Sequence, residues 1–345
     1  MTLTLSVDTA ETYLRARGLI PNGARFEVEE LGWGISNVVL RATIDGDCIV
    51  VKQSLPELRV AEEWRFDRSR IVVERTCMAY LNEILPKGCV PEVRFADDDN
   101  FLFGMSCAPP GGRLWKEELL AGRIDLRAAE HAGRLLAEIH RRAALDRRAR
   151  ELFADQRVLI QGRIDPYHRT AAGRNPRLAP LIDAEVERLL GEQKTLVLGD
   201  YSPKNIFVYR DHALTLDLEV AHFGDPAFDT AFCLTHLILK AFAFPERASA
   251  YARVAQTFWE NYAHSVGSAA GPIERVEAHT VRELGCLLLA RIDGKSKVEY
   301  VTDDRTKETI RKRAREILLG NEQRLEPLIE RIDGSRESGS TRTIE

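Results

Sequence analysis

Several polar side chains, among them three carboxylates and an amide, interrupt residues 198–219, a stretch otherwise rich in strand-forming residues. Asp200 and Asn205 lie five positions apart, and Asp217 and Glu219 follow a short polar turn. A carboxylate can accept the proton of a hydroxyl group, and carboxylate and amide oxygens suit Mg²⁺. Turn-forming residues beside an edge-strand carboxylate are a simpler interpretation of any one of them, but they do not explain the whole set.

A second group of residues could bind phosphate. Gly32 and Gly34 lie between two strand-like runs, where backbone N–H groups can approach phosphate oxygens. Such a pair is more often only a hairpin turn. Lys52 follows inside an apolar strand, and Glu74 falls in the next helical stretch. A lysine held by a glutamate beside a glycine-rich turn is the arrangement that cradles a nucleotide in phosphoryl transfer.

The spacing Asp-x-x-x-x-Asn is typical of the catalytic loop of protein kinases. In that loop the aspartate takes the proton of the attacking hydroxyl and the asparagine holds a metal ion, so we assign these roles to Asp200 and Asn205. Asp217 stands where a second metal-binding carboxylate is expected. Five elements thus occur in the order that a kinase requires: the glycine-rich turn, Lys52, Glu74, the loop with Asp200 and Asn205, and Asp217. The sequence therefore predicts an enzyme that uses ATP and Mg²⁺.

The elements that must position these residues divide into two parts. Residues 26–53 contain three strand-like runs, with Asp45-Gly46 as a tight hairpin turn between the last two. Residues 69–85 have a helical period, and a further strand pair flanks the polar turn "DDDN". The proline- and glycine-rich segment 108–113 ends this β-rich part.

Beyond this segment the pattern is mostly helical, up to about residue 320, apart from a β-hairpin turned at 210–212. We therefore predict an α+β fold, with a nucleotide-binding N-lobe at 1–107 and a larger, mainly α-helical C-lobe at 108–330 that carries the catalytic and substrate-binding residues. Residues 331–345 have little apolar content and are predicted to be a disordered tail.

Composition excludes several classes of protein. The chain has 345 residues and a net charge of −4, which gives no general attraction to nucleic acid or anionic membranes. Neither a signal peptide nor a run of ~18 apolar residues is visible, so we predict a cytoplasmic protein. The cysteines show no zinc-binding spacing and are predicted to be reduced, buried apolar side chains; they are Cys48, Cys77, Cys89, Cys107, Cys233 and Cys286.

The chain resembles the aminoglycoside phosphotransferase and choline kinase family, small-molecule kinases with a bilobal protein-kinase-like fold. "LGDYSPKN", "LDLEVAHFGDPAFD" and "VVKQ" carry the resemblance. The family pattern is His-Gly-Asp with a later Asn, then Asp-x-Glu and a final Asp; Leu198 replaces the His. A narrower likeness, in "VVKQSLPELRV", Trp64 and "SRIVVE", is to methylthioribose kinases, although Asn205 and the loop "DYSPKN" depart from their pattern.

The resemblance implies a division of labour in the site. ATP would lie between the lobes, with its adenine near residues 104–108 and its phosphates near Gly32, Gly34 and Lys52, the last positioned by Glu74. Asp200 would be the base that accepts the proton of a substrate hydroxyl. Mg²⁺ would be held by Asn205, Asp217 and Glu219, and Asp229 would brace the catalytic loop.

The acceptor is defined less well by the sequence. Arg163, Arg291 and Lys295, with Arg169, lie in C-lobe segments that could bind a sugar or an anion, or they could be ordinary helix-end cations. The predicted acceptor is a hydroxyl group of a sugar, thiosugar or amino alcohol. Because a polycation would meet like charges at these cations, we expect a neutral or anionic small polyol or sugar and not a polycationic antibiotic. An aminoglycoside phosphotransferase or a nucleotide-binding pseudokinase are the alternatives. Eleven residues lie between Asp217 and Asp229, too few for the activation segment of a protein kinase proper.

Overall fold

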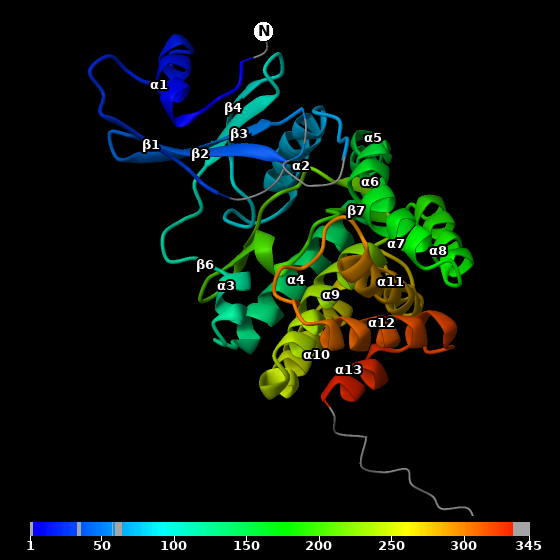
Figure 1. Cartoon of the computed structure of the whole chain (residues 1–345). Coiled ribbons are helices and arrows are strands. Elements are labelled where there is room, and N and C mark those ends of the chain that lie inside the picture. The colour runs from blue at the N-terminus through cyan, green and yellow to red at the C-terminus, as the bar shows by residue number, and fades with distance from the viewer. Residues whose placement is uncertain (1–2, 33–35, 57, 59–63, 334–345) are drawn as a thin grey trace, which may run out of the picture.

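The computed structural model describes residues 3–32, 36–56, 58 and 64–333, and these form two lobes (Figure 1). The N-terminal lobe contains an antiparallel five-stranded sheet in the order β1-β2-β3-β5-β4. Its elements are α1 (Val7–Ala16), β1 (Phe26–Glu30), β2 (Asn37–Ile44), β3 (Asp47–Ser54), α2 (Arg70–Ile84), β4 (Val93–Asp97) and β5 (Leu102–Ser106). The predicted strands and the helix at 69–85 are confirmed, whereas α1 was not predicted.

The sequence specifies β2 and β3 through their turn. Ile44 pairs with Asp47, so the hairpin turns on Asp45 and Gly46 alone. Both have a positive φ, of 49° and 95°, as a two-residue turn that matches the strand twist requires. Gly46 tolerates this backbone without steric cost, and the turn brings Lys52 opposite Val39, in the middle of the sheet.

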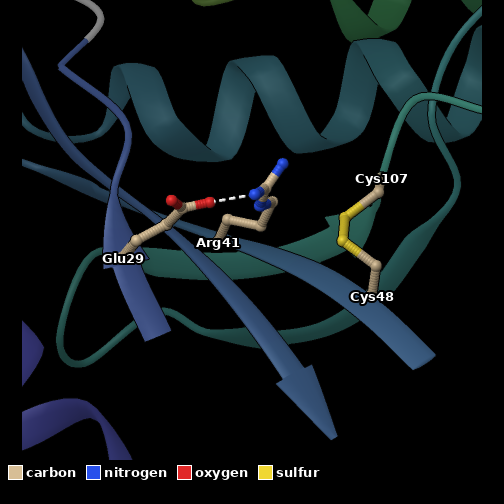
Figure 2. The surroundings of a disulfide bond; sticks show 4 residues. All are labelled: Glu29, Arg41, Cys48 and Cys107. Atoms are coloured by element: carbon tan, nitrogen blue, oxygen red, sulfur yellow. Dashed lines mark ion pairs between the residues drawn. A yellow bond between two sulfur atoms is a disulfide. The ribbon is translucent and has the colours of Figure 1, made fainter. Parts of the chain in front are cut away.

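Two cysteines on neighbouring strands form a disulfide (Figure 2). Cys48 is the second residue of β3 and Cys107 directly follows β5, and the pairing of Ile49 with Ser106 places them opposite each other. Their Cα atoms are 5.7 Å apart, a separation suited to a disulfide. The prediction of reduced, buried cysteines is therefore wrong for this pair, because opposed positions in an antiparallel sheet cannot be read from sequence spacing. Cys77, Cys233 and Cys286 are free and buried, and Cys89 is free and half-buried.

The C-terminal lobe is mainly helical, as predicted. Residues 107–112 connect β5 to it. Its helices are α3 (Trp115–Leu120), α4 (Leu126–Ala144), α5 (Arg147–Leu152), α6 (Arg157–Leu159), η1 (Ile160–Arg169), α7 (Thr170–Arg174), α8 (Ala179–Gly191), η2 (Pro203–Asn205), α9 (Ala227–Ala243), η3 (Pro245–Arg247), α10 (Ala248–Val266), α11 (Ile273–Asp293), α12 (Asp304–Leu319) and α13 (Leu325–Asp333).

The core of this lobe is formed where α4, α9, α10 and α11 pack together. The apolar stripe of α4 is buried, including Leu136 and Ile139, as its helical period requires. Helix α13 was not predicted, and it extends to Asp333, so the tail expected from residue 331 is helical at its start; residues 334–345 lie outside the described part. No single described helix is long and apolar enough to span a membrane, although α9 with Pro245–Val266 meets the length and composition test as a pair bent by 115°.

Five short strands support the catalytic loop. Strands β8 (Ile206–Val208) and β9 (Ala213–Thr215) form the predicted hairpin, which β6 (Arg113–Leu114) extends. Strands β7 (Thr195–Val197) and β10 (His222–Gly224) pair on the other side of the loop. The loop that contains Asp200 is thus anchored at both ends by buried sheet pairs.

Candidate active site

A cavity of about 470 Å³ lies between the two lobes. Its apolar wall includes Val39 and Met105 from the sheet and Leu114 and Leu216 from the C-lobe, which suits a flat heterocycle such as adenine. Its polar lining includes several predicted site residues: Gly32, Lys52, Glu74, Asn205 and Asp217. Gly34 lies outside the described residues.

Lys52 connects the lobes at the base of this cavity. Its Nζ lies 2.7 Å from an oxygen of Glu74 and 2.7 Å from Oδ1 of Asp217. Lys52 is 5 % exposed and Glu74 is fully buried, so this contact lies in a region of low dielectric. The pairing suggested by the order of the sequence is therefore formed, and Asp217 shares the lysine.

The cluster of Lys52, Glu74 and Asp217 contains two carboxylates but one cation, so the two carboxylates compete for the lysine. Burial raises the pKa of Glu74 to about 7 despite the attraction of Lys52. Burial also opposes ionisation of Asp217, but Lys52 and Lys204 outweigh it and lower the pKa of Asp217 to about 2. Burial would lower the pKa of Lys52, but Asp217 and Glu74 reverse this and raise it. Of the two carboxylates Asp217 and Glu74, Asp217 is therefore the one that is fully ionised at neutral pH.

Glu219 is more deeply buried than Asp217, and three side chains donate hydrogen bonds to its carboxylate. Its carboxylate accepts hydrogen bonds from Ser36 Oγ at 2.9 Å, Asn37 Nδ2 at 2.8 Å and Arg70 Nε at 3.3 Å. Arg70 is fully buried and also donates to backbone carbonyls around the N-lobe. Glu219 therefore ties the two lobes together in addition to lying near Asp217.

Asp217 reaches the cavity through a backbone turn. Strand β9 ends at Thr215, and Asp217 has a φ of 60°, a left-handed conformation that is uncommon for a residue with a side chain. Neither Asp217 nor Glu219 lies in a strand, because β9 ends at Thr215 and β10 begins at His222. Nevertheless one carboxylate oxygen from each of Glu74, Asp217 and Glu219 falls within a span of 4.8 Å.

The residues around this turn fit a hard divalent cation. Asn205 Nδ2 donates to the backbone oxygen of Asp200 at 3.0 Å, which leaves the amide oxygen of Asn205 as its acceptor. Asn205 and the ionised Asp217 are both among the residues that line the cavity. Oxygen donors of this kind are the ligands that Mg²⁺ takes together with substrate phosphates.

Asp200 is buried and held by two cations. Its Oδ2 lies 3.0 Å from Arg163 Nη2 and 2.8 Å from Lys204 Nζ. Its Oδ1 is buried and has no hydrogen-bond partner within the described part of the chain. A carboxylate that is oriented through one oxygen and keeps the other as a free acceptor is arranged to receive a proton from a hydroxyl group.

Asp229 holds the loop that carries Asp200. The two carboxylate oxygens of Asp229 accept hydrogen bonds from the backbone N–H groups of Leu198 at 2.7 Å and Gly199 at 2.8 Å. Arg163 Nε donates to the carbonyl oxygen of Gly199 at 2.7 Å. Gly199 has a φ of 74°, and an added Cβ would lie 2.7 Å from Val220. The loop is thus held at several points although Leu198 stands where the family usually has His.

The residues predicted to bind the acceptor have different positions. Arg163 lies in the wide helical turns of η1 and contacts the loop and Asp200. Arg291 is buried and donates from Nη1 to the hydroxyl of Tyr167 at 2.9 Å. Arg169 pairs with Asp165 at the surface. Lys295 lies in the segment after α11, where its backbone N–H donates to Pro166.

Lys204 is the main residue at this site that the sequence reasoning missed. It lines the cavity and contacts Asp200, and its position four residues after Asp200 was an available signal. Ser36, Asn37 and Arg70 were also missed, because nothing in their local sequence indicates that they meet Glu219.

A β-rich lobe above a helical lobe, with the polar loop and the cavity between them, defines a protein-kinase-like fold. The amicoumacin kinase hAmiN, solved with AMP-PNP and Ca²⁺, is similar over 91 % of this chain and 94 % of that chain, with a TM-score of 0.57 at 12 % identity. The model of a phosphotransferase enzyme family, APH, matches residues 27–264. The chain belongs to this family.

Two curated relatives are methylthioribose kinases. One, from Escherichia coli O45:K1, is 28 % identical over 276 residues, which are 70 % of this chain and 65 % of the relative. Methylthioribose kinase 2 from Oryza sativa subsp. japonica is 26 % identical over 247 residues, which are 63 % of this chain and 57 % of the relative. The chain thus spans somewhat less than two thirds of these relatives.

Proposed function

We propose that this protein is an ATP-dependent small-molecule kinase that transfers the γ-phosphoryl group to a hydroxyl group of a sugar, thiosugar or amino alcohol. The observation that carries the proposal is Asp200, which is buried and oriented by Arg163 and Lys204, and whose Oδ1 has no hydrogen-bond partner among the described residues. Membership of the phosphotransferase family and the two methylthioribose kinase relatives support it.

In this proposal each group acts by position and charge. Lys52, held by Glu74, would bind the phosphates, and Asn205 and Asp217 would hold Mg²⁺, which would supply positive charge against the phosphate oxygens. Asp200 orients the acceptor hydroxyl and takes its proton as the oxygen attacks the γ-phosphorus, while the bond from the γ-phosphorus to the bridging oxygen breaks and ADP leaves. Asp229 and Arg163 keep the loop in place, so that no reorganisation is needed during transfer.

Asp200→Asn tests the proposal, because it keeps the shape of the side chain and removes the base. We expect the fold and ATP binding to be retained and turnover to fall by about 10²–10⁴-fold, the usual contribution of a general base. Asp211→Asn, at an exposed turn residue, is the matched control. The acceptor is first found by measuring ATP consumption with sugars, thiosugars, amino alcohols and aminoglycosides. Activity of Asp200→Asn within tenfold of wild type would remove Asp200 from this role.

The charges around the loop disfavour a polycationic acceptor. Arg163 and Lys204 flank Asp200, and Lys116 lines the same cavity. A polycation placed near them would face like charges, which cost several kcal/mol where water is excluded. We therefore expect kanamycin-type compounds to be poorer acceptors than neutral or anionic ones. A kcat/KM for kanamycin above that of every neutral sugar would contradict this expectation.

A further inference from the structure

A cluster of buried basic side chains lies in the C-lobe beyond Asp200. Tyr167 connects it to the catalytic loop: the Arg163 guanidinium lies 5.5 Å from the centre of the Tyr167 ring, and Arg291 lies 5.6 Å from the same ring and donates to its hydroxyl. Helix α9 adds His236 and Lys240. His236 packs 5.2 Å from Phe232, whose ring also lies 5.3 Å from Arg163.

The cluster adjoins the wall of the cavity. Lys116, on α3, and Glu299 both line the cavity and form an ion pair with each other. The residue after Glu299 is Tyr300, whose ring centre lies 5.0 Å from Lys240 Nζ. Lys240 and Tyr300 therefore adjoin residues that line the space between the lobes.

Three polar atoms of this cluster have no hydrogen-bond partner within the described part of the chain. They are Arg291 Nε, His236 Nε2 and the Tyr300 hydroxyl. Buried polar groups are nearly always paired in folded proteins, so three unpaired groups in one place require an explanation. Each can donate a hydrogen bond, His236 through its Nε2 tautomer. Their common requirement is an acceptor that the described chain does not supply.

Lys240 is the least compensated charge in the cluster. It is 1 % exposed, and its Nζ donates to the backbone oxygen of His236 at 3.0 Å. No carboxylate forms an ion pair with it among the described residues. Burial, reinforced by the charge of Lys116, lowers the pKa of Lys240 to about 7. An isolated lysine in the interior is costly unless a negative group pairs with it.

We propose that this cluster, which we call the basic pocket (His236, Lys240, Arg291 and Tyr300), binds a small oxyanion carried by the acceptor. Within the sugar class proposed above, the acceptor is thereby narrowed to an anionic one, a sugar acid or a sugar or polyol phosphate, with its anion in the basic pocket and a hydroxyl toward Asp200. The identification of this anion as part of the acceptor rests on the proposed kinase activity. One such anion accepts hydrogen bonds from the unpaired donors and also balances the charge of Lys240.

The first test measures anion binding without ATP. The probes are D-glycerate and glycerol 3-phosphate, with glycerol at the same concentration and chloride at the same ionic strength as controls. Titration calorimetry on the full chain should detect the two anions and not glycerol. Lys240→Met should weaken the binding of both anions by about tenfold or more, the effect of losing one buried charge contact. Because Lys240 is buried and poorly paired, this change should not impair folding, which thermal unfolding checks.

The matched control is Lys87→Met, at an exposed lysine of the N-lobe, which should leave anion binding unchanged. Arg291→Gln is the second variant, and it should also weaken binding of both anions. The two anions separate the sources: tighter binding of one identifies a carboxylate or a phosphate as the preferred group. Equal affinity of wild type and Lys240→Met for both anions, or no binding of either, would overturn the proposal.

The second test uses turnover of matched acceptors and separates failure of the basic pocket from failure of the kinase proposal. ATP-dependent phosphorylation of D-glycerate should exceed that of glycerol, and Lys240→Met should reduce only the former. If glycerol and other neutral acceptors are phosphorylated better, and Lys240→Met does not matter, the basic pocket is refuted and the kinase stands. If anions bind in a Lys240-dependent way but no acceptor is phosphorylated, the kinase proposal fails and the basic pocket stands.

Discussion

Lys52 and Glu74 form one ion pair, but we expect their removal to have opposite effects on stability. In Lys52→Met, the carboxylates of Glu74 and Asp217 lose the cation between them, and their oxygens lie within 4.8 Å. Two like charges at that distance repel by about 3–4 kcal/mol at an effective dielectric constant near 20. Lys52→Met should therefore lower the free energy of unfolding by about that amount at pH 8.5.

Glu74→Gln should have the reverse effect, because its charge is the unfavourable one. The pKa of Glu74 rises from its ordinary value of 4.5 to about 7 in the folded state, a difference equivalent to about 3 kcal/mol. A raised folded pKa means that the stabilising contribution of the protonated carboxyl is complete below pH 4.5 and is lost as the pH rises through 7. Gln imitates the protonated form, so Glu74→Gln should raise the free energy of unfolding at pH 8.5, by up to about 3 kcal/mol, while Lys52 keeps Asp217 as its partner.

The assay is urea unfolding followed by tryptophan fluorescence at pH 6 and pH 8.5, with Lys87→Met as an exposed-lysine control. Without Lys52, Glu74 should be protonated at pH 6, so the loss in Lys52→Met should be smaller there than at pH 8.5. The double variant should recover most of that loss. In steady-state kinetics both single variants should weaken ATP use, Glu74→Gln less, and the two effects on kcat/KM should not add. Equal losses of stability for both single variants, or a loss in Lys52→Met that does not depend on pH, would refute the reasoning.

The remaining predictions concern the metal, the disulfide and the loop. Activity should require Mg²⁺ or Mn²⁺, and Asp217→Ala should abolish it; an enzyme fully active in excess EDTA would contradict the assignment of Asp217 and Asn205. Reduction of the Cys48–Cys107 disulfide should lower the free energy of unfolding by up to about 4 kcal/mol, since it closes a loop across a separation of 59 residues. Urea unfolding with and without dithiothreitol measures this, and Cys107→Ser should be insensitive to the reductant. Asp229→Ala should leave two loop N–H groups unpaired and lower both stability and kcat, whereas a loss of ATP affinity alone would argue against a bracing role.

The parts of this protein that the sequence predicted well are those set by local rules. Asp45-Gly46 dictates a two-residue turn, and the alternating runs around it form β2 and β3 as expected. The helical period at 69–85 places Glu74 on the face of α2 that meets the sheet. Asp200 and Asn205 belong to one short loop, so their proximity follows from five positions of chain alone.

The sequence by itself therefore determined the order of elements, the catalytic loop and the class of chemistry. Only the tertiary structure decided which distant groups meet. The donors of Glu219 lie as many as 183 residues away, Cys48 joins Cys107 across two strands, and Arg163 turns inward to the loop while Arg169 stays at the surface. Residue types and spacing do not predict such contacts. The contacts depend on how the lobes and helices pack, and the partners that burial and charge bring together are not spaced at any regular interval in the sequence.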